Sequence, residues 1–244
     1  MQPDIAAKLR RLEALETRFQ ELLEAEKLEA LAEFAAGAGH EINNPLAVIS
    51  GRAQLFLKGE TDPERRRELA LVHAQAMRVH EMIADLMLFA RPPEPRKANC
   101  DVAGILDAVL AELTPKAAER RVALVRTELG QPLPVEADAT QLAVALRALI
   151  DNALNALAEG GRVEVSASTV DDGVQIIVRD NGPGLAPEVR RHLFDPFYSG
   201  RGAGRGLGLG LSKCWRIVTN HGGTVEVESE PGRGSTFTIT LPSR

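Results

Sequence analysis

A narrow stripe of apolar residues runs through the first 90 residues with the three- and four-residue spacing of a coiled coil. From residue 4 to about 58 the sequence is rich in Ala, Leu, Glu, Lys and Arg, which are strong helix formers. The stripe consists of Leu12, Leu15, Phe19 and Leu22 and, after a phase slip, of Leu28, Leu31, Ala35, Ala38, Ile42, Ile49 and Ala53. One long helix with a stutter accounts for both parts. We therefore expect a coiled coil over 4–30 and a first helix that continues to about 58.

A second helix is predicted over about 63–90. Asp62 followed by Pro63 matches an N-cap with proline at the first helical position. The apolar stripe of this helix consists of Leu69, Val72, Ala76, Val79, Ile83, Leu86 and Ala90. Two helices with one narrow stripe each cannot enclose a core. We therefore expect the hairpin to form a homodimer through a four-helix bundle.

The segment RPPEPRKAN, residues 91–99, ends the second helix because its three prolines forbid continuation. It is typical of a short stiff linker, so we divide the chain into domains 1–95 and 96–244. In the second domain, spacing predicts a strand from Val122, helices over 138–158, 187–194 and 209–220, and two hairpins, RVEVSAST with VQIIVRD and GTVEVESE with STFTITLP. The hairpins indicate an α/β domain with a mixed or antiparallel sheet and helices on one face.

Charge and composition exclude several classes of partner. The chain has 29 basic and 34 acidic side chains with no long block of one sign, so we expect neither nucleic acid nor a membrane surface as a partner. We find no apolar run long enough to span a bilayer. The two cysteines are too few for a disulfide framework and fit a reducing compartment, so we expect a cytoplasmic location, with membrane attachment if this chain is part of a longer protein.

The stretch GAGHEINNPL, residues 37–46, places a histidine beside a glutamate. The stripe passes through Ala38 and Ile42, and His40 lies two residues from each, roughly 200° away around the helix, so His40 faces water. Asn44 lies one turn further on the same face. Pro45 removes a helical hydrogen bond to residue 41 and should bend the helix here. Such a histidine fits a nucleophile, but an exposed histidine beside a glutamate is more often only part of a solvated helix face, and the stretch alone leaves both interpretations open.

Three motifs in the second domain fit a nucleotide ligand. DNALNAL begins at residue 151, RDNGPGL at 179 and GRGLGLGLS at 204. A carboxylate at a strand end accepts a hydrogen bond from an exocyclic amine, and a glycine-rich turn into a helix N-terminus binds anions. Each motif alone is weak, because alternating glycines also make flexible loops and DNG also makes hairpin turns.

Taken together and in this order, the motifs resemble those of the sensor histidine kinases of two-component systems. GHEINNPL resembles the phosphoacceptor box, DNALNAL the asparagine box, DNGPGL and GRGLGLGLS the two glycine boxes, and FDPFYSG the phenylalanine box. The resemblance implies an α+β chain of two domains: the dimeric helical hairpin, then a GHKL-type, Bergerat-fold ATP-binding α/β sandwich. It implies an ATP-dependent protein-histidine kinase that passes its phosphoryl group to an aspartate of a response regulator.

The resemblance also implies roles for residues on the first helix. His40 corresponds to the phosphoacceptor, and Glu41 to the partner that orients the imidazole and takes its proton. Asn44 corresponds to a position that places a water for dephosphorylating the regulator, which leaves regulator phosphatase activity open as a second output.

In the second domain, the resemblance implies ATP and Mg²⁺ as ligands. Asn152 corresponds to the Mg²⁺ ligand and Asp180 to the residue that reads the adenine amine. Positions in the glycine and phenylalanine boxes correspond to the pocket lining, the phosphate contacts and the hinge of a lid: Gly182, Gly184, Phe194, Phe197, Gly206, Leu207, Gly208, Leu209 and Gly210. Asn155 is also assigned to the nucleotide site, although many relatives have lysine there, so one phosphate contact should be weaker or come from the lid.

Ala148 is the other departure from the family pattern. Related ATPases place a water-activating glutamate one turn before the Mg²⁺ asparagine, so hydrolysis by that route is disfavoured here. Two alternatives remain: a degenerate ATP-binding signalling scaffold, and an ATPase of the gyrase or chaperone class.

Overall fold

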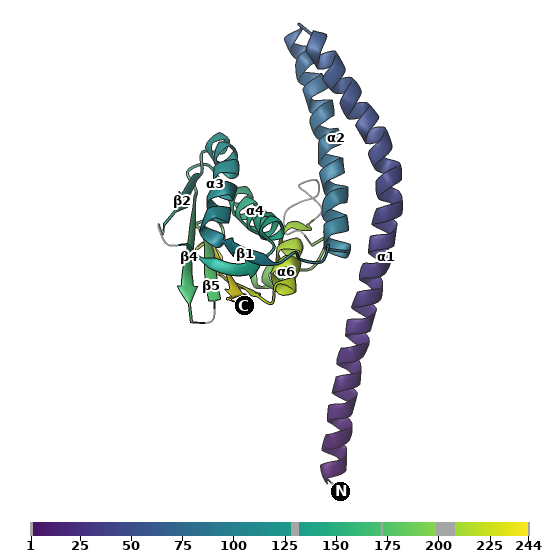
Figure 1. Cartoon of the computed structure of the whole chain (residues 1–244), viewed down its shortest axis with the longest axis vertical. Coiled ribbons are helices and arrows are strands. Elements are labelled where there is room, and N and C mark those ends of the chain that lie inside the picture. The colour runs from purple at the N-terminus through teal and green to yellow at the C-terminus, as the bar shows by residue number, and fades with distance from the viewer. Residues whose placement is uncertain (1, 128–131, 172, 199–207, 244) are drawn as a thin grey trace. The chain divides into compact units, whose positions relative to one another are not determined.

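The computed structural model describes residues 2–127, 132–171, 173–198 and 208–243, and Figure 1 shows the course of the chain. The chain divides into two compact units, Met1–Pro92 and Pro93–Arg244. No described helix is both long and apolar enough to cross a lipid bilayer.

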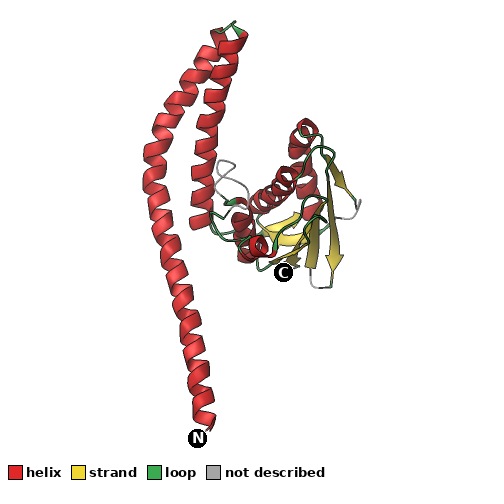
Figure 2. Ribbon diagram, turned by 180° about the vertical axis from the view of Figure 1, so that it is seen from behind, coloured by secondary structure: helices red, strands yellow, loops and turns green. Residues whose placement is uncertain are grey.

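The first unit is a helical hairpin of α1, Gln2–Gly59, and α2, Pro63–Ala90, which confirms the two expected helices. Asp62 caps α2 as expected, because its side chain accepts hydrogen bonds from the backbone N–H groups of Glu64 and Arg65. Pro45 lies inside α1, and the helix continues through it without interruption. Figure 2 shows α1 as one bowed helix rather than two broken segments.

Small residues make up most of the buried contact between α1 and α2. The buried residues of the hairpin, apart from Phe89, are small: Ala32, Ala35, Gly39, Ala53, Ala76 and Ala90. Several large apolar side chains are exposed instead, including Ile42, Val48, Ile49, Leu55, Phe56, Leu71 and Val72. Ile42 and Ile49, which belong to the predicted stripe, keep 41% and 45% of their surface exposed in the single chain. One hairpin therefore does not bury its own stripe.

Polar contacts between histidines of α2 and side chains of α1 also join the two helices. His73 forms hydrogen bonds with Ser50 Oγ at 2.8 Å and with Gln54 Nε2 at 3.2 Å. His80 Nδ1 forms a hydrogen bond with Asn43 Oδ1 at 2.9 Å. No role was predicted for these histidines, and in the structure they connect α2 to α1 at two positions along the hairpin.

The second unit is built on a sheet formed by five of the described strands, in the order β2-β4-β5-β7-β6. These strands are β2 Ala123–Arg126, β4 Arg162–Val170, β5 Gly173–Asp180, β6 Thr224–Ser229 and β7 Ser235–Pro242. β2 pairs with β4 in parallel, and the other pairs are antiparallel. The predicted mixed, mostly antiparallel sheet and both predicted hairpins are confirmed.

Helices cover one face of this sheet (Figure 2). They are α3 Val102–Glu119, α4 Ala139–Ala156 and α6 Gly210–Asn220; a short helix, α5, spans Pro187–Arg191. α4 packs against α3, α6, β4 and β5. Alternate residues of β7 are buried, namely Ser235, Phe237, Ile239 and Leu241. This alternation is expected of a sheet with one covered face.

The structure contains three elements that the sequence did not predict. α3 is one, and the others are the short strands β1, Ala98–Asp101, and β3, Pro134–Ala137, which pair antiparallel as a separate ribbon. β1 lies partly inside the stretch interpreted as a linker. Each strand has four residues, too few for a clear alternation. α3 contains Pro115, and a proline normally argues against a helix interior.

The chain is fastened to α4 where it enters the second unit. Gln141 Nε2 donates to Pro93 O at 3.0 Å, and the backbone N–H of Arg96 donates to Asp138 Oδ2 at 3.0 Å. The buried His221, at the end of α6, accepts from the backbone N–H of Asp138 at 3.0 Å. Desolvation raises the pKa of Asp138, but backbone donors, Arg96 first, and His221 together hold it below its ordinary value. These contacts join the linker, the start of α4 and the end of α6.

Substitution at Gly234 should destabilise the second unit strongly. Gly234 has φ +84°, and a Cβ there would lie 2.0 Å from the backbone oxygen of Asp180. Gly232 has φ +80° but open space around it. We expect Gly234→Ala to cost about 3 kcal/mol or more, from left-handed backbone strain and overpacking, and Gly232→Ala only about 1–2 kcal/mol from the strain.

Urea unfolding followed by the fluorescence of Trp215 tests this pair, because it is the chain's single tryptophan and lies in the second unit. Equal unfolding midpoints for the two variants would show that the turn around Gly234 is not held against β5.

Candidate active site

His40 lies on an exposed face of α1, as the stripe predicts. The preceding residue, Gly39, is buried, and a Cβ there would lie 3.1 Å from Ile83 Cγ2 of α2. α2 therefore approaches α1 closely beside His40, and the absence of a side chain at Gly39 permits this approach. The bond between Asn43 and His80 fixes the two helices one turn further along.

Glu41 and Asn44 are exposed like His40. Within the part of the chain that the structure describes, none of these three side chains forms a hydrogen bond or an ion pair. Glu41 is adjacent to His40 but not bonded to its ring. The arrangement offers an accessible imidazole, a neighbouring carboxylate and an amide one turn away.

The end of α4 and the end of β5 meet in the second unit. Asn152 and Asn155 lie on the last two turns of α4, and Asp180 is the last residue of β5. A Cβ at Gly182 would lie 3.2 Å from Leu157 Cδ2, so the loop after β5 lies against the end of α4. The fold thus brings together residues of the asparagine motif and of the first glycine motif.

Asp180 is buried, with 4% of its surface exposed, and its Oδ1 accepts the backbone N–H of Gly182 at 2.9 Å. A Cβ at Gly182 would lie 2.8 Å from that oxygen, so the glycine lets the loop turn tightly around the carboxylate. A buried carboxylate held in place by a backbone donor is suited to accept a specific hydrogen bond from a ligand.

Two other predicted glycines have clear structural reasons. Gly184 has φ +68°, and a Cβ there would lie 2.0 Å from the backbone oxygen of Glu230. Gly208 has φ +70°, and a Cβ there would lie 2.5 Å from the backbone oxygen of Tyr198. Gly184 therefore allows the turn between β6 and β7 to pack closely against it, and Gly208 packs closely against the phenylalanine motif. A Cβ at Gly210, by contrast, would meet open space.

The start of α6 adjoins these residues. Leu209 is its buried N-cap residue and provides no side-chain cap. In the phenylalanine motif, Phe194 is half-buried, and Phe197 is exposed with φ +64°, an uncommon conformation for a non-glycine residue. The predicted lid, which follows the phenylalanine motif and runs to about Gly206, falls largely on residues 199–207, and these, with Gly206 and Leu207 among them, lie outside the described residues.

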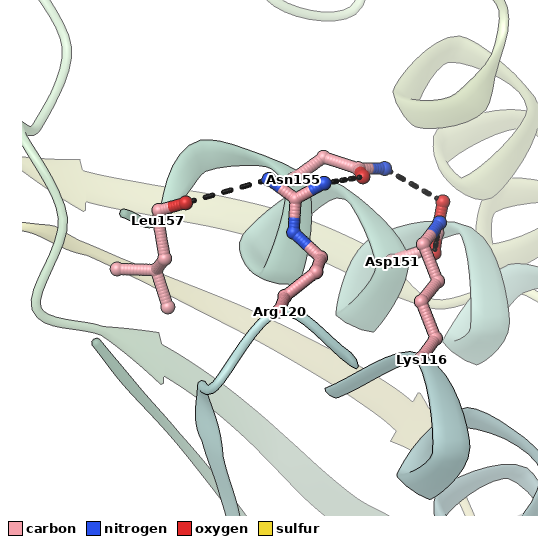
Figure 3. Close-up of polar contacts among 5 residues, drawn as sticks. All are labelled: Lys116, Arg120, Asp151, Asn155 and Leu157. Atoms are coloured by element: carbon pink, nitrogen blue, oxygen red, sulfur yellow. Dashed lines mark hydrogen bonds and ion pairs between the residues drawn. The ribbon is translucent and has the colours of Figure 1, made fainter. Parts of the chain in front are cut away.

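A chain of polar contacts links α3 to the last turns of α4 (Figure 3). Lys116 forms an ion pair with Asp151 Oδ1, and Asn155 Nδ2 donates to Asp151 Oδ2 at 2.8 Å. Arg120 donates from Nη1 to Asn155 Oδ1 and from Nη2 to Leu157 O, both at 3.4 Å. Both carboxylate oxygens of Asp151 and both polar atoms of Asn155 are therefore engaged. Sequence reasoning missed Lys116, Arg120 and Asp151, because no local pattern connects residues 35 apart.

The donor set at this site fits Mg²⁺ bound together with a nucleotide. Among the described residues, no group of three or more His, Cys, Asp or Glu side chains is arranged to hold a metal ion. Asn152 carries an amide oxygen, and both carboxylate oxygens of its neighbour Asp151 are engaged by Lys116 and Asn155. Mg²⁺ suits so sparse a set, since it commonly takes one or two protein oxygens plus phosphate oxygens and waters.

Comparison with known families matches both units. Residues 30–95 match the family described as the His Kinase A (phospho-acceptor) domain. Residues 137–244 match the family described as the histidine kinase-, DNA gyrase B-, and HSP90-like ATPases.

Individual relatives span nearly the whole chain. The sensor histidine kinase ZraS of Escherichia coli K12 is 34% identical over 224 residues, which are 91% of this chain and 48% of ZraS. Sporulation kinase D of Bacillus subtilis is 33% identical over 225 residues, 90% of this chain and 43% of that protein. The crystal structure of full-length ShkA in complex with AMPPNP superposes with a TM-score of 0.75 at 29% identity, covering 86% of this chain and 45% of ShkA. The chain thus spans about half the length of the curated relatives it matches.

Proposed function

Because the chain belongs to the sensor histidine kinases of two-component systems, we propose that it phosphorylates His40 with ATP and passes the phosphoryl group to a response regulator. The observation that carries the proposal is the exposed His40, beside Glu41, in a chain whose second unit also holds a buried carboxylate, Asp180, followed by a loop that lies against the end of α4, the helix that carries Asn152. The helical hairpin supplies the histidine that accepts the phosphoryl group, and the second unit supplies the nucleotide site.

ATP is the proposed phosphoryl donor. Asp180 accepts a hydrogen bond from the exocyclic amine of adenine, and Gly182, which has no side chain, lets the loop after β5 approach the base. The first backbone N–H groups of α6, beginning at Gly210, bind phosphate oxygens because no side chain caps them. The relative ShkA, whose structure was determined with the ATP analogue AMPPNP, supports this choice of ligand.

Mg²⁺ is proposed to accompany the nucleotide, with Asn152 as a protein ligand. It neutralises negative charge on the phosphates. The protein then has little covalent chemistry to perform besides positioning the two reactants. Ala148, one turn before Asn152, provides no group to activate water, which favours transfer to a histidine over hydrolysis.

Transfer begins when a ring nitrogen of His40 attacks the γ-phosphorus in line with the leaving oxygen. A nitrogen–phosphorus bond forms, the bond to the bridging oxygen of ADP breaks, and Glu41 takes the proton from the imidazole. The phosphoramidate is labile, so the group passes on to an aspartate of a receiver domain. Asn44 is proposed to place a water for the reverse output, dephosphorylation of the regulator.

A homodimer is the proposed working form. Large apolar side chains remain exposed on the hairpin. At its turn end, a groove of about 740 Å³ is lined by Leu55, Phe56 and Leu69, with charged residues at its edge. A second hairpin would cover these residues and complete a four-helix bundle. The response regulator should dock on the polar faces of the hairpin that the second hairpin leaves exposed. Because the proposed reaction uses ATP, we propose a cytoplasmic location for the chain.

The direct test is incubation of the full chain with Mg²⁺ and ATP labelled at the γ-phosphate. We expect label on the protein that is lost in acid and stable in base, as a phosphoramidate requires, and that moves to a receiver domain. ATP binding without label would indicate a signalling scaffold. Steady phosphate release without label would indicate an ATPase of the gyrase class.

A further inference from the structure

α3 and α4 are joined by three side-chain contacts at a constant separation of 35 residues. Glu112 pairs with Arg147, Lys116 with Asp151, and Arg120 with Asn155. Because both members advance by four residues at each step, the two helices run parallel in this register. The first two contacts are ion pairs. The third joins an arginine to a neutral amide, so the series ends in a positive charge without a counter-charge.

The contacts of Arg120 are weak for an arginine. Both of its acceptors, Asn155 Oδ1 and Leu157 O, are neutral and lie 3.4 Å away, beyond the usual range for N–H···O bonds. Arg120 itself is exposed, and within the described residues no carboxylate pairs with it. The nearby Asp151 is committed to Lys116 and Asn155. The guanidinium can therefore exchange its present bonds for an anion at little cost.

Both acceptors of Arg120 border the candidate nucleotide site. Asn155 is three residues from Asn152, which places it about 60° away around α4, between the face of Asn152 and the face that contacts α3. Leu157 lies against Gly182, next to Asp180. The guanidinium thus lies at the C-terminal end of α4, beside Asn155 and the backbone oxygen of Leu157 (Figure 3).

We propose that Arg120 binds the phosphate chain of the nucleotide and supplies the positive charge that Asn155 does not. The planar guanidinium can hold two phosphate oxygens through parallel N–H···O bonds, and it carries the positive charge that the neutral amide of Asn155 lacks. The sequence led us to expect that this phosphate contact would be weaker or would come from the lid. The contacts of Figure 3 assign it to the C-terminal end of α3 instead. This inference rests on the proposed ATP binding.

The competing role for Arg120 is structural, since an arginine bonded to Leu157 O also caps the end of α4. The two roles differ in how they depend on the phosphates. We expect Arg120→Gln in the full chain to weaken ATP binding about 30-fold, from the loss of charged hydrogen bonds. Adenosine binding should change by less than about twofold, because adenosine carries no phosphate for a guanidinium to bind. NMR titrations with each ligand measure both affinities.

Two further variants sharpen the test. Adding Asn155→Lys to Arg120→Gln should restore most of the ATP affinity, because a lysine there reaches the same edge of the site from α4. Arg147→Gln removes an arginine from the same helix interface, but that arginine is paired with Glu112, so ATP affinity should be unchanged. Equal losses for ATP and adenosine in Arg120→Gln, or no loss, would overturn the inference. Failure of the unmodified chain to bind ATP would instead refute the proposed function.

Discussion

His40→Gln removes phosphorylation of the chain by ATP and leaves its ATP affinity unchanged. The amide of glutamine is similar in size and polarity to imidazole, but its nitrogen is not nucleophilic. Loss of the attacking group should lower the rate of labelling by at least about a thousandfold. The ATP affinity is unaffected, because His40 belongs to the helical hairpin and the nucleotide residues to the second unit. Initial rates of labelling and a nucleotide titration measure the two quantities.

His73→Gln is the matched control for this substitution. His73 lies on the same hairpin, but its ring is bonded to Ser50 and Gln54 and has no proposed part in the reaction. We expect its labelling to remain within about twofold of the unmodified chain, since glutamine retains hydrogen-bonding groups at this position. Acid-labile label on His40→Gln would mean that another histidine is the acceptor. Phosphate release that continues undiminished without His40 would favour an ATPase of the gyrase or chaperone class.

The elements that the sequence predicted correctly are those with long, regular patterns. The stripes gave both long helices, and Asp62 with Pro63 gave the start of α2 because a cap and a proline act locally. The alternation of β4, β5, β6 and β7 gave the two hairpins. These features depend on residues close together in the chain, so one sequence is enough to find them.

Features set by distant partners could not be predicted in the same way. β1 and β3 are four residues each and are defined by their pairing, such as Ala98 opposite Ala137. The contact of Arg120 with Asn155 depends on how α3 and α4 align. α3 itself was not predicted, because it contains Pro115, and a proline normally argues against a helix interior. Gly184 belonged to a predicted motif, yet the close approach of Glu230 that requires a glycine there is visible only in the fold.

Asp180→Asn should weaken ATP binding by about 2–3 kcal/mol, roughly 30- to 150-fold. In the structure, Oδ1 accepts the backbone N–H of Gly182, and asparagine can keep that bond with its carbonyl oxygen. Its amide nitrogen then occupies the place of the other carboxylate oxygen. Two donors, this nitrogen and the exocyclic amine of adenine, would then face each other, and such an opposed pair is costly at a buried position like that of Asp180.

The same reversal predicts a change in base preference. Guanine carries a carbonyl oxygen where adenine carries its amine, so the amide of Asp180→Asn can donate to GTP while it opposes ATP. The ratio of ATP affinity to GTP affinity should therefore fall in Asp180→Asn. The same ratio should stay unchanged in a matched variant, Asp171→Asn, because the side chain of Asp171 is exposed in the turn between β4 and β5. Parallel titrations with both nucleotides measure this ratio. If Asp180→Asn weakened ATP and GTP equally, Asp180 would support the pocket without contacting the base, because only a direct hydrogen bond distinguishes an amine from a carbonyl.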